Sequence, residues 1–141
     1  MLLLKPFIPV CFVVAALGLH AQDSTKTKKK ISRVQYGTAS FYSNKFEGRK
    51  TASGELFSQK KLTAAHNTLP LGTYIRVTNL RNKRSVVVKI NDRLHAKNLR
   101  LVDLSRTAAT QLGYIKSGLA RVKVEVLGKT PPAEKQKYVS K

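Results

Sequence analysis

The stretch that most constrains the fold is residues 86–90, Val-Val-Val-Lys-Ile, which lead directly into Asn91, Asp92 and Arg93. A run of β-branched residues with a single lysine is typical of a strand that is buried over most of its surface. Charged side chains are rarely buried without a partner, so the strand should end where these polar residues begin. We therefore expect Asp92 to lie at the rim of a sheet or barrel.

Other short segments carry strand patterns as well. Residues 74–79 alternate between aliphatic and polar side chains, and a turn at 80–83 leads into 85–90, which predicts a hairpin. Residues 120–126 alternate between small aliphatic and charged side chains, as expected for a sheet with one solvated face. Residues 36–42 are a short, aromatic-rich strand candidate.

One helix is predicted after the buried strand. Ser105 can cap its N-terminus, and Gly113 can end it. Between them, Ala108, Ala109 and Leu112 provide an apolar side. Many short strands with one short helix predict a mainly β fold, a small closed barrel that leaves no exposed sheet edges.

The domain organisation follows from composition. Residues 1–21 have one early lysine and then a charge-free apolar run, which predicts a secretory signal peptide that would be removed together with Cys11. Lipidation of Cys11 is an alternative, but it would require a signal of only ten residues. Residues 22–35 and 128–141 are polar and lysine-rich, which predicts disordered basic arms around a single barrel domain at 36–127.

The net charge is +20, from 27 Lys and Arg against 7 Asp and Glu. Such an excess draws a protein to polyanions. For an exported chain, in the periplasm or cell envelope, the expected polyanions are cell-wall glycan and anionic envelope surfaces rather than nucleic acid. Metal binding is not expected, because the mature chain would have two histidines, no cysteine and no close ligand spacing.

Polar residues that a core does not need gather in two segments. Residues 51–55 contain Thr51, Ser53 and Glu55 in a small, glycine-containing loop. Residues 63–73, which contain His66 before a proline- and glycine-rich turn, are also expected to form a loop. Together with Asp92, these segments are the expected location of the chemistry.

Six strings of residues follow one another along the chain: 37–42, 46–55, 62–73, 77–82, 90–93 and 102–105. Taken in order, they resemble the rare lipoprotein A family of double-psi β-barrel domains. The resemblance implies a six-stranded double-psi β-barrel with one short helix. It also implies an endolytic peptidoglycan lytic transglycosylase that needs no cofactor and cleaves strands poor in stem peptides. The family's acidic and imidazole site residues fall on Glu55, His66 and Asp92.

The sequence departs from the family pattern at one point. Family members usually continue the Asp-Arg pair with Gly-Pro, whereas Leu94 and His95 follow here. The shape of this rim loop is therefore not implied by the resemblance.

The reaction assigns a role to each site residue. In a lytic transglycosylase the substrate's own C6 hydroxyl closes a 1,6-anhydro ring, so one carboxyl group can act first as acid and then as base. We assign that role to Asp92, which partial burial or a nearby Glu55 would help to protonate. Glu55 and His66 are expected to orient or balance charge. Substrate contacts are expected from Tyr42, Thr51, Ser53, Asn91 and Arg93.

Two other functions fit the sequence alone. An expansin-like module could bind wall glycan without cutting it, and the altered rim loop at Leu94 and His95 keeps this alternative open. In either case the chain is expected to be a monomer. An exported binder of nucleic acid or lipopolysaccharide, driven by charge alone, is a weaker alternative. Without the resemblance, an Asp at a strand end more commonly caps a turn or pairs with the neighbouring Arg.

Overall fold

The computed structural model describes residues 33–133. The expected signal peptide lies outside the described residues, as do most of the two expected arms at 22–35 and 128–141. Within the described range, no helix is both long and apolar enough to cross a membrane.

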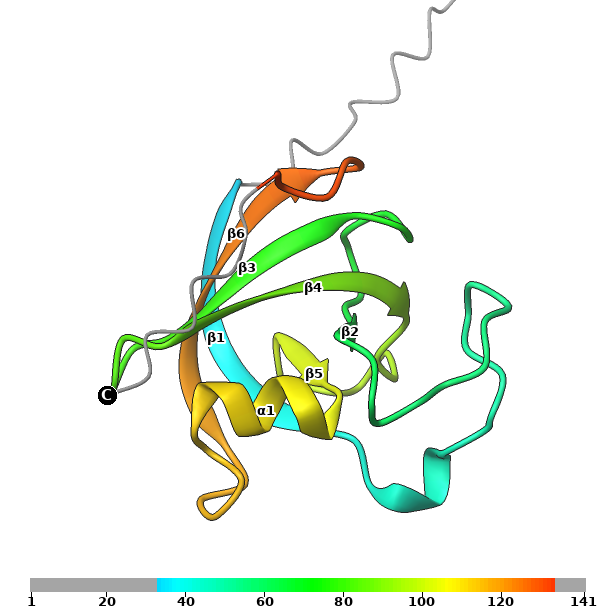
Figure 1. The fold of residues 1–141 in the computed structure, drawn as a ribbon, viewed down its shortest axis with the longest axis horizontal. Coiled ribbons are helices and arrows are strands. Elements are labelled where there is room, and N and C mark those ends of the chain that lie inside the picture. Colours follow the sequence, from blue (N-terminus) through cyan, green and yellow to red (C-terminus); the bar gives the residue numbers. More distant parts are fainter. Residues whose placement is uncertain (1–32, 134–141) are drawn as a thin grey trace, which may run out of the picture.

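Six strands form a closed barrel in the order β1-β5-β2-β4-β3-β6, with one short α-helix packed against β1 and β4 (Figure 1). The β1–β5 and β2–β4 pairs are parallel and the other four are antiparallel. This mixed barrel confirms the predicted mainly β fold. The elements are β1 (Val34–Phe41), η1 (Asn44–Phe46), β2 (Thr63–Ala65), β3 (Tyr74–Asn79), β4 (Ser85–Asp92), β5 (Val102–Leu104), α1 (Arg106–Leu112) and β6 (Ala120–Gly128).

The strands with long periodic patterns form as predicted. The β3–β4 hairpin pairs Ile75 with Val88, and Val77 with Val86, and all four side chains are buried. In β6 the alternation also holds, because Val124 is fully buried between two partly exposed charged residues.

The sequence pattern predicts a loop for residues 63–73, and this is wrong for the first three of them. Thr63–Ala65 form β2, which pairs with both β4 and β5 and is entirely buried. A strand of three small residues has neither the length nor the alternation that a sequence pattern can reveal. As a consequence, His66 directly follows a buried strand.

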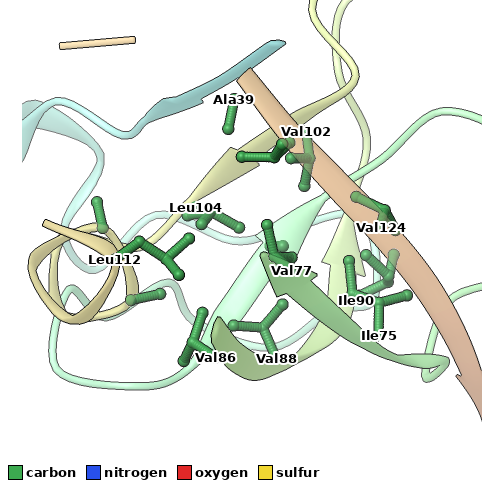
Figure 2. Packing of buried hydrophobic residues seen from close by; sticks show 14 of the residues in the cluster. Ala39, Ile75, Val77, Val86, Val88, Ile90, Val102, Leu104, Leu112 and Val124 are labelled. Carbon is green, nitrogen blue, oxygen red and sulfur yellow. The ribbon is translucent and has the colours of Figure 1, made fainter. Parts of the chain in front are cut away.

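The aliphatic side chains of all six strands converge in one core (Figure 2). Full burial of each Val, Leu or Ile contributes about 1.5–3 kcal/mol. Leu112 inserts from α1 into the same cluster. The helix begins as predicted: Ser105 Oγ accepts from the Ala108 N–H, and Gly113 ends the helix with a positive φ of 74°. The core therefore fixes the barrel whose rim carries Asp92.

Candidate functional site

Asp92 is the last residue of β4, and a β-bulge sets its position. Along the β2–β4 pair, Ala64 lies opposite Ile90 but Ala65 lies opposite Asp92, so Asn91 is an extra residue on β4. Bulges bend a strand and re-aim its side chains. Here the bulge buries Asn91, which is 2% exposed, next to the half-buried Asp92.

Three hydrogen-bond donors hold the Asp92 carboxylate. The Tyr42 hydroxyl donates to Oδ2 at 2.7 Å. The backbone N–H groups of Ala52 and Arg93 donate to Oδ1 at 3.0 and 2.9 Å. Bonds to an ionised acceptor are among the stronger ones in proteins. The carboxylate is therefore fixed in direction by three separate segments of the chain.

An aromatic stack positions Tyr42, which follows β1. Its ring lies 4.3 Å from that of Phe57 and 5.6 Å from that of Phe46, measured between centroids. Burial, together with the hydrogen bond to Asp92, raises the pKa of the Tyr42 hydroxyl well above its usual value. Tyr42 therefore keeps its proton and remains a donor to Asp92.

The loop at 51–55 folds onto the end of β4. The Ser53 N–H donates to the Asn91 carbonyl at 3.0 Å, and the Thr51 hydroxyl donates to the Glu55 carbonyl at 2.8 Å. Thr51 is 8% exposed, whereas Ser53 is exposed. Gly54 closes the turn at a φ of 89°, a backbone conformation that other residues rarely adopt.

Glu55 faces Lys89 and Asn91 rather than the Asp92 carboxylate. The Lys89 ammonium donates to Oε1 at 2.9 Å, and the Asn91 amide reaches Oε2 at 3.5 Å. The hydrogen bond from Lys89 holds the pKa of Glu55 below its usual value. Glu55 is therefore ionised near neutral pH, and it accepts a hydrogen bond from Asn91, the residue before Asp92.

His66 directly follows β2 and is buried, with 2% of its surface exposed. Its Nδ1 accepts from the N–H groups of Thr68 and Leu69, at 3.1 and 3.2 Å. The proton must then be on Nε2, which donates to Gln35 Oε1 at 2.9 Å. Burial, with the positive charge of Arg93, lowers the pKa of His66 to about 4. The imidazole is therefore neutral at physiological pH.

The Arg93 side chain turns away from the Asp92 carboxylate. Its Nη1 donates to the carbonyls of His66 and Leu69, both at 2.7 Å, so it clamps the turn that His66 also caps. In addition, the His66 N–H donates to the Asp92 carbonyl at 3.1 Å. Thus His66 contacts the backbone of Asp92, and Arg93 reaches the Asp92 carboxylate through its backbone N–H alone. The Tyr42 side chain, in contrast, contacts the carboxylate directly.

The rim loop that departs from the family pattern is closed by its own residues. Leu94 is 8% exposed, and His95 is exposed. The His95 carbonyl and Nδ1 accept from the N–H groups of Asn98 and Lys97. The aliphatic side chain therefore packs inward, while the imidazole caps a local turn.

Several site contacts carry no signal in the sequence. The Ala52 N–H is a backbone donor, and the Gln35–His66 pair joins residues 31 positions apart. The Lys89–Glu55 pair could have been suspected only from opposite charges. Across residues 33–133, no three His, Cys, Asp or Glu side chains gather as metal ligands would.

Comparison with known proteins identifies the family. The profile of the family described as Lytic transglycolase matches residues 34–124, from β1 into β6. The chain belongs to this family. The match confirms the resemblance to rare lipoprotein A proteins and the double-psi β-barrel fold.

Two relatives of this family are both named Endolytic peptidoglycan transglycosylase RlpA. The one from Pasteurella multocida is 52% identical over 116 residues, which are 82% of this chain and 38% of the relative. The one from Neisseria meningitidis serogroup A is 45% identical over 139 residues, which are 90% of this chain and 58% of the relative. The chain therefore spans less than two thirds of either relative.

Two solved structures have a fold similar to that of this chain. The Streptomyces papain inhibitor matches with a TM-score of 0.56 at 19% identity, over 69% of this chain and 96% of the inhibitor. An apo expansin of Clavibacter michiganensis matches with a TM-score of 0.55 at 20% identity, over 70% of this chain and 52% of the expansin. At these identities the likeness concerns the fold alone.

Proposed function

We propose that the chain is an endolytic peptidoglycan lytic transglycosylase. It would cleave the bond between N-acetylmuramic acid and N-acetylglucosamine in strands poor in stem peptides, without a cofactor. The names of its relatives support this activity. The observation that carries the proposal is the half-buried Asp92 carboxylate, aimed by three donors at the rim of the barrel.

The hydrogen bonds of Asp92 leave room for a proton. A carboxylate offers about four acceptor positions. Among residues 33–133, Oδ1 accepts from two N–H groups and Oδ2 accepts from the Tyr42 hydroxyl alone, so the remaining position is on Oδ2. We place the transferable proton there. The Tyr42 bond then keeps this oxygen directed throughout the reaction.

A single carboxyl group balances the whole reaction. Asp92 gives its proton to the glycosidic oxygen as the bond from the anomeric carbon breaks. The C6 hydroxyl of the same muramic acid residue then bonds to that carbon, and its proton passes to Asp92. The products are a free hydroxyl on one fragment and a 1,6-anhydro ring on the other, and no water is consumed.

In this proposal Glu55 and His66 position their neighbours and transfer no proton. Glu55 is ionised, so it orients Asn91 and does not serve as the acid. His66 is neutral and has both ring nitrogens engaged, so it holds the backbone beside Asp92. Of the two loop residues whose hydroxyls are expected to contact sugar, Ser53 is exposed and Thr51 is buried. We assign the substrate contact to Ser53.

The setting of the enzyme is part of the same proposal. An apolar stretch at 1–21 supports export to the periplasm or cell envelope. The barrel strands run from Val34 to Gly128, slightly beyond the 36–127 expected from the sequence, between two basic segments. The basic charge supports attraction to the anionic cell wall. We propose that the enzyme acts as a monomer.

The test uses purified glycan strands from which an amidase has removed the stem peptides. The wild-type chain should release fragments with anhydro-muramic ends, detected by mass spectrometry. Asp92→Asn should lower the rate by roughly 10²–10⁴-fold, the range for loss of a general acid. A suitable control is Glu125→Gln, because Glu125 is a partly exposed carboxylate that pairs with Lys123 on β6.

The same assay separates the enzyme from a binding module. If wild-type protein sediments with the strands, releases no fragments and binds equally well as Asp92→Asn, the expansin-like module is the correct reading. Full activity of Asp92→Asn would also contradict the proposed role of this residue.

A further inference from the structure

The barrel end opposite Asp92 carries a cluster of bases. The β3–β4 hairpin and the segment from the end of α1 to the start of β6 meet there: the Leu80 N–H donates to the Arg121 carbonyl at 3.0 Å, and the Asn82 amide donates to the Leu112 carbonyl at 2.8 Å. Five exposed bases on these two segments make up what we call the basic end. They are Arg81, Lys83, Arg84, Lys116 and Arg121.

The basic end holds no acid of its own. Residues 80–91 and 104–124 contain neither Asp nor Glu. In the part of the chain that the structure describes, Lys89, Arg100 and Lys123 form ion pairs, and none of these bases belongs to the basic end. The charge of the basic end is therefore not neutralised within the barrel.

An exposed aliphatic side chain accompanies these bases. Leu119 is 53% exposed, in the turn between Lys116 and Arg121. Tyr114, the aromatic residue of this segment, is 2% exposed and donates to the Ser40 carbonyl, so it offers no ring for stacking. Bases around an aliphatic side chain suit a charged lipid surface, whereas single-stranded nucleic acid is held by exposed aromatic rings.

The basic end and the Asp92 site lie at opposite ends of β4. β4 begins at Ser85 in the hairpin and ends at Asp92, and Figure 1 shows these points at opposite ends of the strand. Eight residues of strand span about 23 Å. A flat surface that contacts the hairpin would therefore leave the Asp92 rim free.

We propose that the basic end docks onto an anionic phospholipid bilayer, with Leu119 entering the headgroup region. The five bases attract the lipid phosphates, and the aliphatic side chain adds apolar contact. This docking is independent of the proposed function, since it would hold even if Asp92 catalysed nothing.

The test is sedimentation of the full chain with vesicles of phosphatidylglycerol and phosphatidylcholine, compared with vesicles of phosphatidylcholine alone. The test variant is Lys83→Gln with Lys116→Gln. The matched control is Lys50→Gln with Lys60→Gln, which removes the same charge from exposed lysines outside the basic end. Every variant keeps the same termini, so differences between them report the substituted lysines. Circular dichroism spectra and thermal melts confirm that each variant folds.

Each lysine of the basic end should contribute roughly fivefold to binding of the anionic vesicles, so the test variant should bind roughly 25-fold more weakly. The control should change much less. Leu119→Ser should weaken binding while leaving its salt dependence unchanged, because only the apolar contact is lost.

Three results would overturn the proposal. Test and control variants could lose binding equally, which would mean that only net charge matters. Binding could be the same on vesicles without anionic lipid. Finally, Lys83 and Lys116 could govern binding to purified wall glycan and not to vesicles, which would make the basic end a glycan surface.

Discussion

The neutral state of His66 makes stability depend on pH in a defined window. The ordinary histidine pKa of 6.5 applies to the unfolded chain, and burial with the Arg93 charge lowers the value to about 4 in the fold. Between pH 6.5 and 4, His66 therefore binds a proton in the unfolded state but not in the folded state. Stability should be constant in this respect above about pH 6.5 and should fall as the pH approaches 4. The difference amounts to about 3 kcal/mol.

Urea unfolding at a series of pH values would measure this loss. His66→Asn is the informative variant, because its side-chain oxygen can still accept from the Thr68 and Leu69 N–H groups but cannot titrate. Glu55 contributes in a separate window. Its lowered pKa stabilises the fold above the ordinary glutamate pKa of 4.5, and this contribution is lost only at lower pH.

Between about pH 7 and pH 4.5, the wild-type chain should lose roughly 2–3 kcal/mol more stability than His66→Asn. Parallel losses in the two proteins would refute the reasoning. They would mean that His66 can be protonated within the fold, and a charged imidazole would then be available to the site.

Three further variants test contacts in and around the barrel. Tyr42→Phe removes one hydrogen bond to the Asp92 carboxylate. Because a hydrogen bond to a charged group contributes about 1.5–3 kcal/mol, kcat should fall roughly 10–100-fold with KM little changed. Steady-state kinetics on peptide-free strands would measure this. Ser105→Ala removes the N-cap of α1 and should cost about 1 kcal/mol in urea unfolding with activity intact. Gly37→Ala would place a methyl group 2.6 Å from Leu101 Cβ, so it should lower the free energy of unfolding by about 1–3 kcal/mol, which a smaller loss would contradict.

The parts of the fold that could be predicted are those whose local pattern agrees with their burial. The long alternations of β3 and β6 and the capped helix α1 are such cases. β2 could not be found, because three small residues buried between two strands carry no periodic signal. The β-bulge at Asn91 was equally hidden, since it depends on the register with a strand that the sequence does not reveal.

For the site, sequence could name residues but not their contacts. The structure brings Tyr42 and Ala52 to the Asp92 carboxylate across 50 and 40 positions of chain, which no local pattern encodes. It also turns the His66 ring and the Arg93 side chain toward the turn after β2 and away from the carboxylate, because both find hydrogen-bond partners in the backbone of that turn. Protonation states depend on such partners, so they follow only from the fold.

The measurement that tests the central claim most directly is digestion of peptide-free glycan strands in water enriched in heavy oxygen. If Asp92 drives ring closure by the C6 hydroxyl, the new muramic ends should be anhydro and should carry no heavy oxygen. Incorporation of the label at those ends would show that water attacks the sugar, and it would contradict a mechanism that relies on one carboxyl group.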